Sequence, residues 1–209
     1  MKLSIAMKSL LATAALALPL VASAASTYTT GAGTLTAAAT VNFQVVIPQF
    51  LYLRVGTGSS YTTGALSTVN TTDLITFSVA PGSVGNGTAV AGVGGDLTGG
   101  VETAAILGNG GNVTLTATAT GALSDGNGDT IPYTQITTTA AANTTGYTTL
   151  AAPALSNTTT TETVTATNKI VQADAKWTYG YANSVTAPGG TYGGTAANNG
   201  TVTYTATMP

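Results

Sequence analysis

Apolar and polar residues alternate along several segments of the chain with a period of two. Asn112–Thr120 places valine, leucine or alanine at every second position with threonine or asparagine between them, and Thr201–Thr207 repeats this arrangement. Val41–Ile47 alternates in the same way apart from Val46. Because successive side chains of a strand point to opposite faces, these segments predict β-strands with one buried face. Threonine favours strands and keeps their outer face polar without charge.

Further strands are predicted between clusters of glycine, asparagine, aspartate and proline, the residues that turns require. No segment beyond residue 24 shows a helical period. The spacing of the turns predicts one all-β domain of about eight or nine antiparallel strands, arranged as a sandwich or barrel. Pro48 should mark a bend or an edge, and the threonine-rich stretch Thr158–Thr161 is interpreted as a loop. The additional strands are Phe50–Val55, Leu74–Val79, Val101–Leu107, Ile131–Thr139, Thr163–Ala173 and Lys176–Tyr181.

The first 24 residues have the pattern of a secretory signal peptide. Lys2 and Lys8 precede the apolar run Leu10–Val21, and Ala22-Ser23-Ala24 fits the small-residue cleavage site. The apolar run is shorter than the ~20 residues that span a bilayer, so we expect no membrane span after cleavage. The predicted organisation is a signal peptide over 1–24 and a single β domain over 25–209. Export predicts a secreted or cell-surface protein, with the periplasm as an alternative.

The amino-acid composition excludes several kinds of catalytic and binding chemistry. The chain has five Lys and Arg, seven Asp and Glu, no His and no Cys, against 45 threonines and 26 glycines. The lack of His and Cys excludes disulfides, thiol nucleophiles, catalytic triads with histidine and thiolate or imidazole metal ligands. The domain beyond the signal peptide retains only Arg54, Lys169 and Lys176 as cations, too few for a nucleic acid partner. We therefore predict no enzymatic activity, no catalytic residues and no cofactor-binding residues.

Asp125-Gly126-Asn127-Gly128-Asp129 is the one candidate metal site. Side-chain oxygens at alternate positions, from Asp125, Asn127 and Asp129, suit a calcium loop. The full helix–loop–helix calcium pattern is absent, because Thr130 and Ile136 occupy the positions that need glycine and an acid. The favoured interpretation is a tight turn between two strands, and calcium is the only cofactor that the sequence suggests.

The aromatic side chains of Trp177, Tyr179 and Tyr181 lie at alternate positions of one predicted strand, on one face. Such a row could stack on a sugar ring and is the candidate ligand-binding site. The favoured interpretation is core packing, because aromatic side chains on a common strand face are usually buried.

The order of these segments also supports a resemblance. A signal peptide, the alternating segment Leu35–Val45, a threonine-rich β domain and the closing alternating strand Val202–Ala206 follow one another. This layout resembles Gram-negative fimbrial subunits of the chaperone–usher route, including the spore-coat-U-like branch. The resemblance implies an immunoglobulin-like β-sandwich completed by a strand from a neighbour. Such subunits often carry a disulfide and an aromatic residue near the C-terminus, whereas this chain lacks cysteine and ends in Thr207-Met208-Pro209.

Two functions follow as hypotheses. The first is an exported structural or adhesive subunit, which associates with its own kind or with other surface subunits through strand edges. The second is a secreted module that binds carbohydrate or another ligand. The uncharged segment 25–40 is interpreted as an extended N-terminal strand, donated to a neighbour or paired within its own sheet, with a disordered terminus as the third alternative.

Overall fold

The computed structural model describes residues 26–57, 66, 68 and 71–209, and the predicted signal peptide lies outside them. The chain divides into two units, 1–47 and 48–209. Residues 26–47 contain no strand, although the alternation over Val41–Ile47 predicts one. Two side-chain hydrogen bonds join parts of this unit, from Thr27 to the Ala38 carbonyl (2.6 Å) and from Thr29 to the Thr36 carbonyl (3.2 Å). A strand needs a partner for its backbone groups, and the described part of this unit supplies none.

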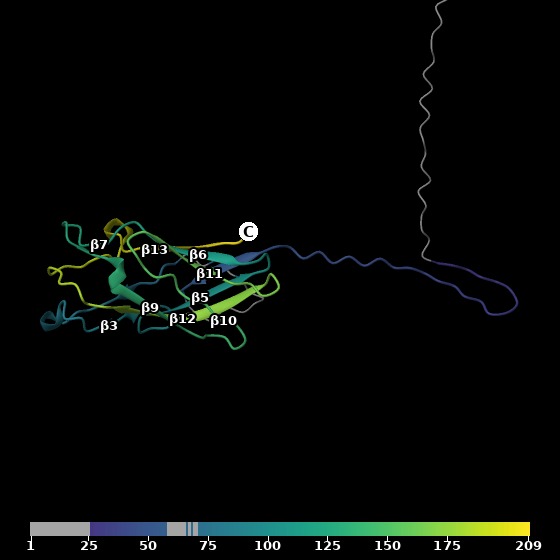
Figure 1. Cartoon of the computed structure of the whole chain (residues 1–209), viewed down its shortest axis with the longest axis horizontal. Coiled ribbons are helices and arrows are strands. Elements are labelled where there is room, and N and C mark those ends of the chain that lie inside the picture. Colours follow the sequence, from purple (N-terminus) through teal and green to yellow (C-terminus); the bar gives the residue numbers. More distant parts are fainter. Residues whose placement is uncertain (1–25, 58–65, 67, 69–70) are drawn as a thin grey trace, which may run out of the picture. The chain divides into compact units, whose positions relative to one another are not determined.

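The second unit is built on a six-stranded sheet around its longest strand, β12 (Figure 1). β5 and β3 pair with one edge of β12, whereas β10 and β9 pair with the other, and β1 extends the sheet beyond β5. All pairs are antiparallel except β10 with β12. The strands are β1 (Leu51–Val55), β3 (Val90–Ala91), β5 (Val101–Gly108), β9 (Ile136–Ala141), β10 (Thr148–Thr149) and β12 (Val171–Tyr181).

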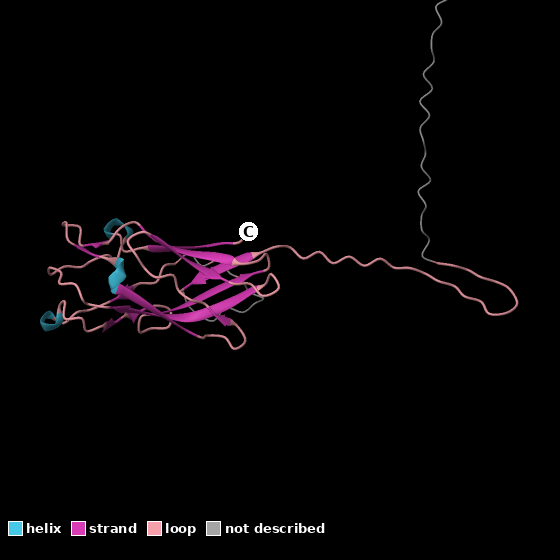
Figure 2. Cartoon of the chain, viewed as in Figure 1, coloured by secondary structure: helices cyan, strands magenta, loops and turns pink. Residues whose placement is uncertain are grey.

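A three-stranded antiparallel sheet has the order β11-β6-β13, and two small sheets pair β2 with β4 and β7 with β8. Its strands are β6 (Val113–Ala119), β11 (Thr159–Val164) and β13 (Val202–Thr207). The short strands are β2 (Ile75–Thr76), β4 (Val93–Gly94), β7 (Leu123–Ser124) and β8 (Thr130–Ile131). Three 3-10 turns, Pro81–Ser83, Tyr133–Gln135 and Ala196–Asn198, are the helical elements of the described residues (Figure 2). Among the described residues, no helix is both long and apolar enough to cross a membrane.

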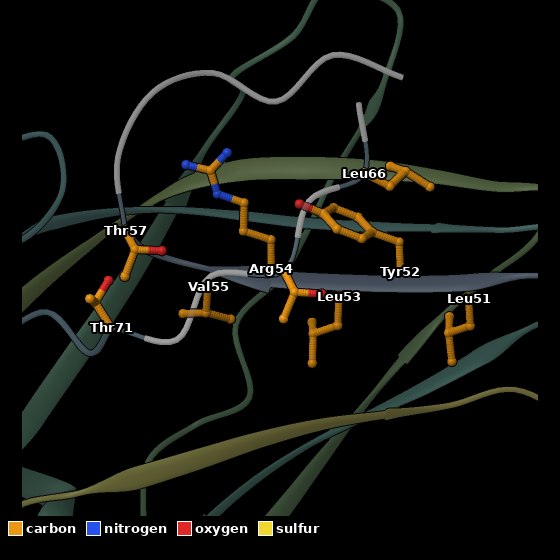
Figure 3. Close-up of a pocket in the computed structure, with 9 residues that line it drawn as sticks. Leu51, Tyr52, Leu53, Arg54, Val55, Thr57, Leu66 and Thr71 are labelled. Carbon is orange, nitrogen blue, oxygen red and sulfur yellow. The ribbon is translucent and has the colours of Figure 1, made fainter. Parts of the chain in front are cut away.

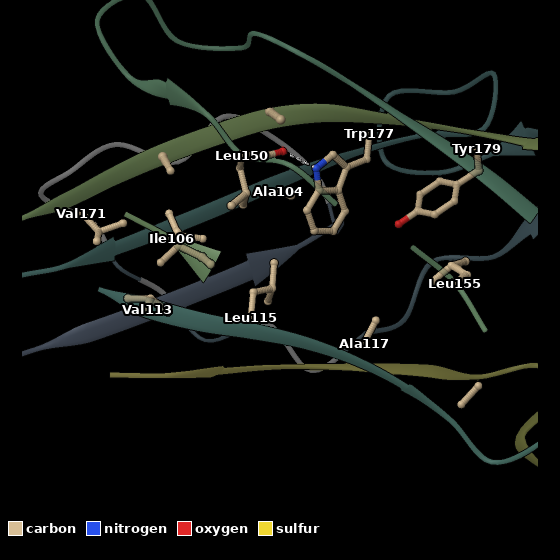
Figure 4. Close-up of a cluster of buried hydrophobic side chains, with 14 of the residues drawn as sticks. Ala104, Ile106, Val113, Leu115, Ala117, Leu150, Leu155, Val171, Trp177 and Tyr179 are labelled. Carbon is tan, nitrogen blue, oxygen red and sulfur yellow. Dashed lines mark hydrogen bonds between the residues drawn. The ribbon is translucent and has the colours of Figure 1, made fainter. Parts of the chain in front are cut away.

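One hydrophobic core lies between the two larger sheets (Figure 4). Ile106 from β5 and Trp177 from β12 meet Val113 and Leu115 from β6, and all four side chains are fully buried. The alternation in β6 accounts for this arrangement, because its valine, leucine and alanine side chains face the core while its threonines face outward. The predicted β-rich, mostly antiparallel class is confirmed.

Element boundaries differ from the prediction at several places. Only Ile75–Thr76 of the predicted strand Leu74–Val79 forms a strand, β2. The predicted strand Ile131–Thr139 is split by Pro132, which begins a 3-10 turn because it lacks a backbone N–H. The predicted break before Lys176 is wrong, since β12 runs straight through Asp174. The break lies instead at Asn168 and Lys169, both with positive φ (51° and 67°), between the mutually hydrogen-bonded Thr167 and Ile170. Both positive φ values are typical of the tight turns that join hairpin strands.

The number of strands also exceeds the prediction. The described residues form thirteen strands, of which six have only two residues and are too short to leave a period-two signal in the sequence. Thr159–Thr161 begin β11 instead of forming a loop tip.

Candidate functional site

A groove of about 980 Å³ lies among the described residues of the unit 48–209. β1 contributes Leu53 and Val55 to its lining, and β13 contributes Val202 and Tyr204. In the described residues each of these two strands pairs along one edge only, β1 with β5 and β13 with β6. The groove therefore lies where strands from both large sheets have unpaired edges. Other apolar lining residues include Ile75, Phe77, Leu123, Ile131, Tyr133, Ile136, Leu155, Tyr179 and Tyr181.

Two carboxyl groups stand in the wall of this groove. Asp73 precedes β2, Glu102 lies on β5 with only 5% of its surface exposed, and their side chains share a hydrogen bond. The backbone N–H of Thr57 donates to Asp73, and that of Asp96 donates to Glu102 (3.3 Å). Burial, together with the negative charges of Asp73 and Asp96, raises the pKa of Glu102 to about 7. A carboxyl group with a raised pKa, that of Glu102, therefore lies hydrogen-bonded to a second acid in a mostly apolar wall.

The backbone of Gly56 lies so close to the carboxyl groups of Asp73 and Glu102 that no side chain fits at this position. A Cβ at this position would lie 2.5 Å from Glu102 Oε2 and 2.6 Å from Asp73 Oδ2. Its φ of +73° also lies in the region that side-chain-bearing residues rarely adopt. Both conditions explain why glycine follows β1.

Arg54 lies on the opposite face of β1 from Leu53 and Val55 (Figure 3). It lines a second pocket of about 320 Å³ together with Tyr52 and Thr57. Arg54 Nη2 is 3.8 Å from Asp96 Oδ2, and Arg54 Nε donates to the Gly56 carbonyl (3.1 Å). Asp96 also accepts from the backbone N–H (2.8 Å) and the hydroxyl of Thr103. The positive charge of Arg54 thus partly balances the negative charge of Asp96, whose backbone N–H donates to Glu102.

The three aromatic residues of the candidate ligand site are all buried. The Trp177 ring is 0% exposed, and its Nε1–H donates to the Leu150 carbonyl (2.8 Å). The Tyr179 hydroxyl lies 3.0 Å from that of Tyr204, and burial raises the pKa of both phenols. Tyr179 and Tyr181 border the groove, whereas Trp177 does not. Trp177 therefore belongs to the core and presents no ring face to a sugar.

Asp125, Asn127 and Asp129 form a turn between β7 and β8. Asp125 Oδ1 accepts from the backbone N–H groups of Asn127 (2.8 Å) and Asp129 (3.1 Å), and the Asn127 amide donates to Asp125 Oδ2 (3.3 Å). These bonds lower the pKa of Asp125. Within the described residues no group of three or more acidic side chains has the arrangement of a metal site.

The turn geometry predicts that calcium does not stabilise the protein. Since the Asp125 carboxylate is satisfied by turn hydrogen bonds, we expect equal melting temperatures in millimolar calcium and in chelator. Differential scanning calorimetry in both buffers measures this. A melting temperature that rises by several degrees in calcium would instead support the calcium-loop interpretation.

No family model, curated protein or solved structure matches the chain.

The described part of the N-terminal unit carries a second candidate interaction surface, in addition to the groove. Val41, Phe43, Val45 and Ile47 are 70%, 91%, 82% and 76% exposed. They occupy alternate positions, so they would share one face of an extended strand. Large apolar side chains exposed in a row are typical of a surface that another chain covers.

Sequence reasoning missed the acid cluster of Asp73, Asp96 and Glu102. Asp73 lies before β2, far in the sequence from Glu102 on β5, so only folding brings these two together, whereas Asp96 lies in the loop just before β5. The one local signal is Glu102 itself, a carboxylate at the start of a mostly apolar strand.

Proposed function

We propose that the chain is an exported structural or adhesive subunit, and that copies of it join when the segment 41–47 of one copy adds as a strand to the groove of the next. The single observation that carries this proposal is the row of exposed apolar side chains at Val41, Phe43, Val45 and Ile47. The predicted signal peptide supports export to the cell surface or the extracellular space.

The groove has the features that a donated strand needs. Its walls include β1 and β13, whose unpaired edges can hydrogen bond to an added strand. Its lining is mainly aliphatic and aromatic, which suits alternate apolar side chains from an incoming segment. In this mode of recognition the backbone bonds provide affinity, and the alternate side chains provide the register.

The arrangement of the sheets is compatible with this proposal. Two sheets with a common core suggest an antiparallel β-sandwich, and the incoming strand would bridge β1 of one sheet and β13 of the other. An immunoglobulin-like topology, which the resemblance to fimbrial subunits implies, is part of the same proposal.

A pair of adjacent substitutions tests the assembly. Phe43→Asp places a charge on the apolar face of the segment and should weaken association by at least about 100-fold, or about 3 kcal/mol. Gln44→Asp adds the same charge on the opposite face and should leave association nearly unchanged. Electron microscopy and sedimentation velocity of the purified mature chain would measure filaments and oligomers.

The outcomes separate the two functions. Oligomers that disappear in Phe43→Asp and persist in Gln44→Asp support the subunit. A parent chain that stays monomeric at high concentration contradicts it and favours the alternative, a secreted ligand-binding module that uses the same tyrosine-lined groove. In that case a soluble apolar ligand should raise the melting temperature of the monomer.

A further inference from the structure

The outward face of the three-stranded sheet carries a regular array of threonines. In the register of β11, β6 and β13, Thr159, Thr118 and Thr203 lie opposite one another and form one row across the sheet. The next two rows contain threonine at every position: Thr161, Thr116 and Thr205, then Thr163, Thr114 and Thr207. We call these nine residues the threonine array.

The β geometry determines the two spacings of the array. Neighbouring strands lie about 4.8 Å apart, and alternate residues of one strand lie about 6.7 Å apart. Nine hydroxyls and nine methyl groups therefore repeat on a nearly rectangular net. Because only three strands contribute, the twist accumulates over just two strand pairs, at about 20–25° each.

Core packing beneath the sheet and hydrogen bonds between neighbouring residues fix the side chains of the threonine array. Val113, Leu115 and Ala117, which alternate with its central threonines, are almost completely buried in the core. The hydroxyls of Thr118 and Thr159 lie 3.0 Å apart, and the Thr116 hydroxyl donates to the Thr205 carbonyl (3.3 Å). Such bonds reduce the rotamer freedom of the side chains, so less entropy is lost when the face binds a ligand.

The side chains of the threonine array are unsuited to several classes of ligand. Its nine residues include no charged and no aromatic side chain, so neither an ionic partner nor a sugar ring that stacks finds its usual contacts. Its area, from the two spacings above, is about 300 Å², well below the ~800 Å² per partner of a stable protein interface. A second copy of this chain is therefore a poor occupant of this face.

We propose that the threonine array is a binding surface for ice. Water oxygens on the prism faces of hexagonal ice repeat on a rectangular net whose two periods are close to those of the array. A hydroxyl that does not donate within the sheet can take the place of a lattice water as donor and acceptor, whereas the Thr116 hydroxyl and one of the Thr118–Thr159 pair can only accept. Each methyl group can occupy a hollow between lattice waters. The surface of a crystal with the same repeat can contact all three rows of threonines at once. These simultaneous contacts compensate for the small area of the threonine array.

Ice growth measured with matched variants tests the proposal. We expect the mature chain to inhibit ice recrystallisation and to label a growing ice surface when it carries a fluorophore. Thr116→Tyr breaks the centre of the array and should raise the concentration needed by about tenfold. Thr178→Tyr, the same change on the exposed outer face of β12, should have no effect. Thr203→Lys, on the edge strand β13, is a second array variant in case Thr116→Tyr does not fold, as judged by circular dichroism.

Three results would overturn the proposal. The first is a parent chain no more active on ice than an inert protein of equal size. The second is an equal loss in Thr116→Tyr and Thr178→Tyr. The third is adsorption to crystalline chitin or cellulose without adsorption to ice. None of these results depends on Phe43 or on the groove, so the ice proposal and the subunit proposal fail independently.

Discussion

Replacing Trp177 by alanine is expected to destabilise the domain by about 4 kcal/mol, the largest loss expected for any single side chain of the core. The ring is completely buried and packs at 5.4 Å from the Tyr204 ring, so its removal leaves a cavity between the two large sheets. The substitution also leaves the Leu150 carbonyl without its indole partner, which adds about 1 kcal/mol. Urea unfolding followed by circular dichroism would measure the change.

Two further variants show which part of the Trp177 side chain causes the loss of stability, and whether the loss is specific to this position. Trp177→Phe keeps an aromatic ring but removes the indole N–H, so we expect an intermediate loss of about 2 kcal/mol. Thr178→Ala changes the next residue of β12, whose side chain is exposed, and should alter stability by less than about 0.5 kcal/mol. A Trp177→Ala variant as stable as the parent would contradict the position of this ring in the core and reopen its interpretation as a ligand platform.

Strands with a strict alternation could be predicted from sequence because one short segment contains the whole signal. β6 and β13 lie within one residue of their predicted bounds for this reason. The predicted break before Lys176 is wrong because β12 includes Asp174, a buried carboxylate in the middle of the strand. The carboxylate is tolerated because the Asn143 amide (3.1 Å) and the Thr144 N–H (3.2 Å) donate to it from a loop. Those partners are distant in sequence and gave no local signal.

The two surfaces proposed here differ in how far the sequence could reveal them. The outward position of the threonines follows from alternation within each strand. Their alignment into rows depends on the pairing register of β11, β6 and β13, which no single segment encodes. The groove depends equally on register, because β1 and β13 belong to different sheets and are separated by most of the domain's sequence.

The stability of the protein is expected to fall as the pH rises from about 5 to 8, and Glu102 is the cause. Its pKa is 4.5 without the fold and about 7 within it, so the folded state binds a proton that the unfolded state releases. The favourable contribution is complete below pH 4.5 and is lost progressively as the pH approaches and passes 7. At 1.36 kcal/mol per pH unit, the raised pKa corresponds to a loss of about 3 kcal/mol by pH 8.5. Urea unfolding at a series of pH values would measure it.

Glu102→Gln should remove most of this pH dependence. The glutamine amide can donate to Asp73 as the protonated acid does, and its oxygen can accept from the Asp96 N–H, so the contacts in the groove wall are retained. The variant should match the parent near pH 5 and exceed its stability by as much as about 3 kcal/mol at pH 8.5. Other groups near Glu102 are Asp73, Asp96, Tyr179 and Tyr204, with Arg54 behind Asp96. Glu162→Gln, on β11 and outside this group, should keep the parent's pH dependence. A parent whose stability stays constant or rises between pH 5 and 8 would show that Glu102 does not hold the proton.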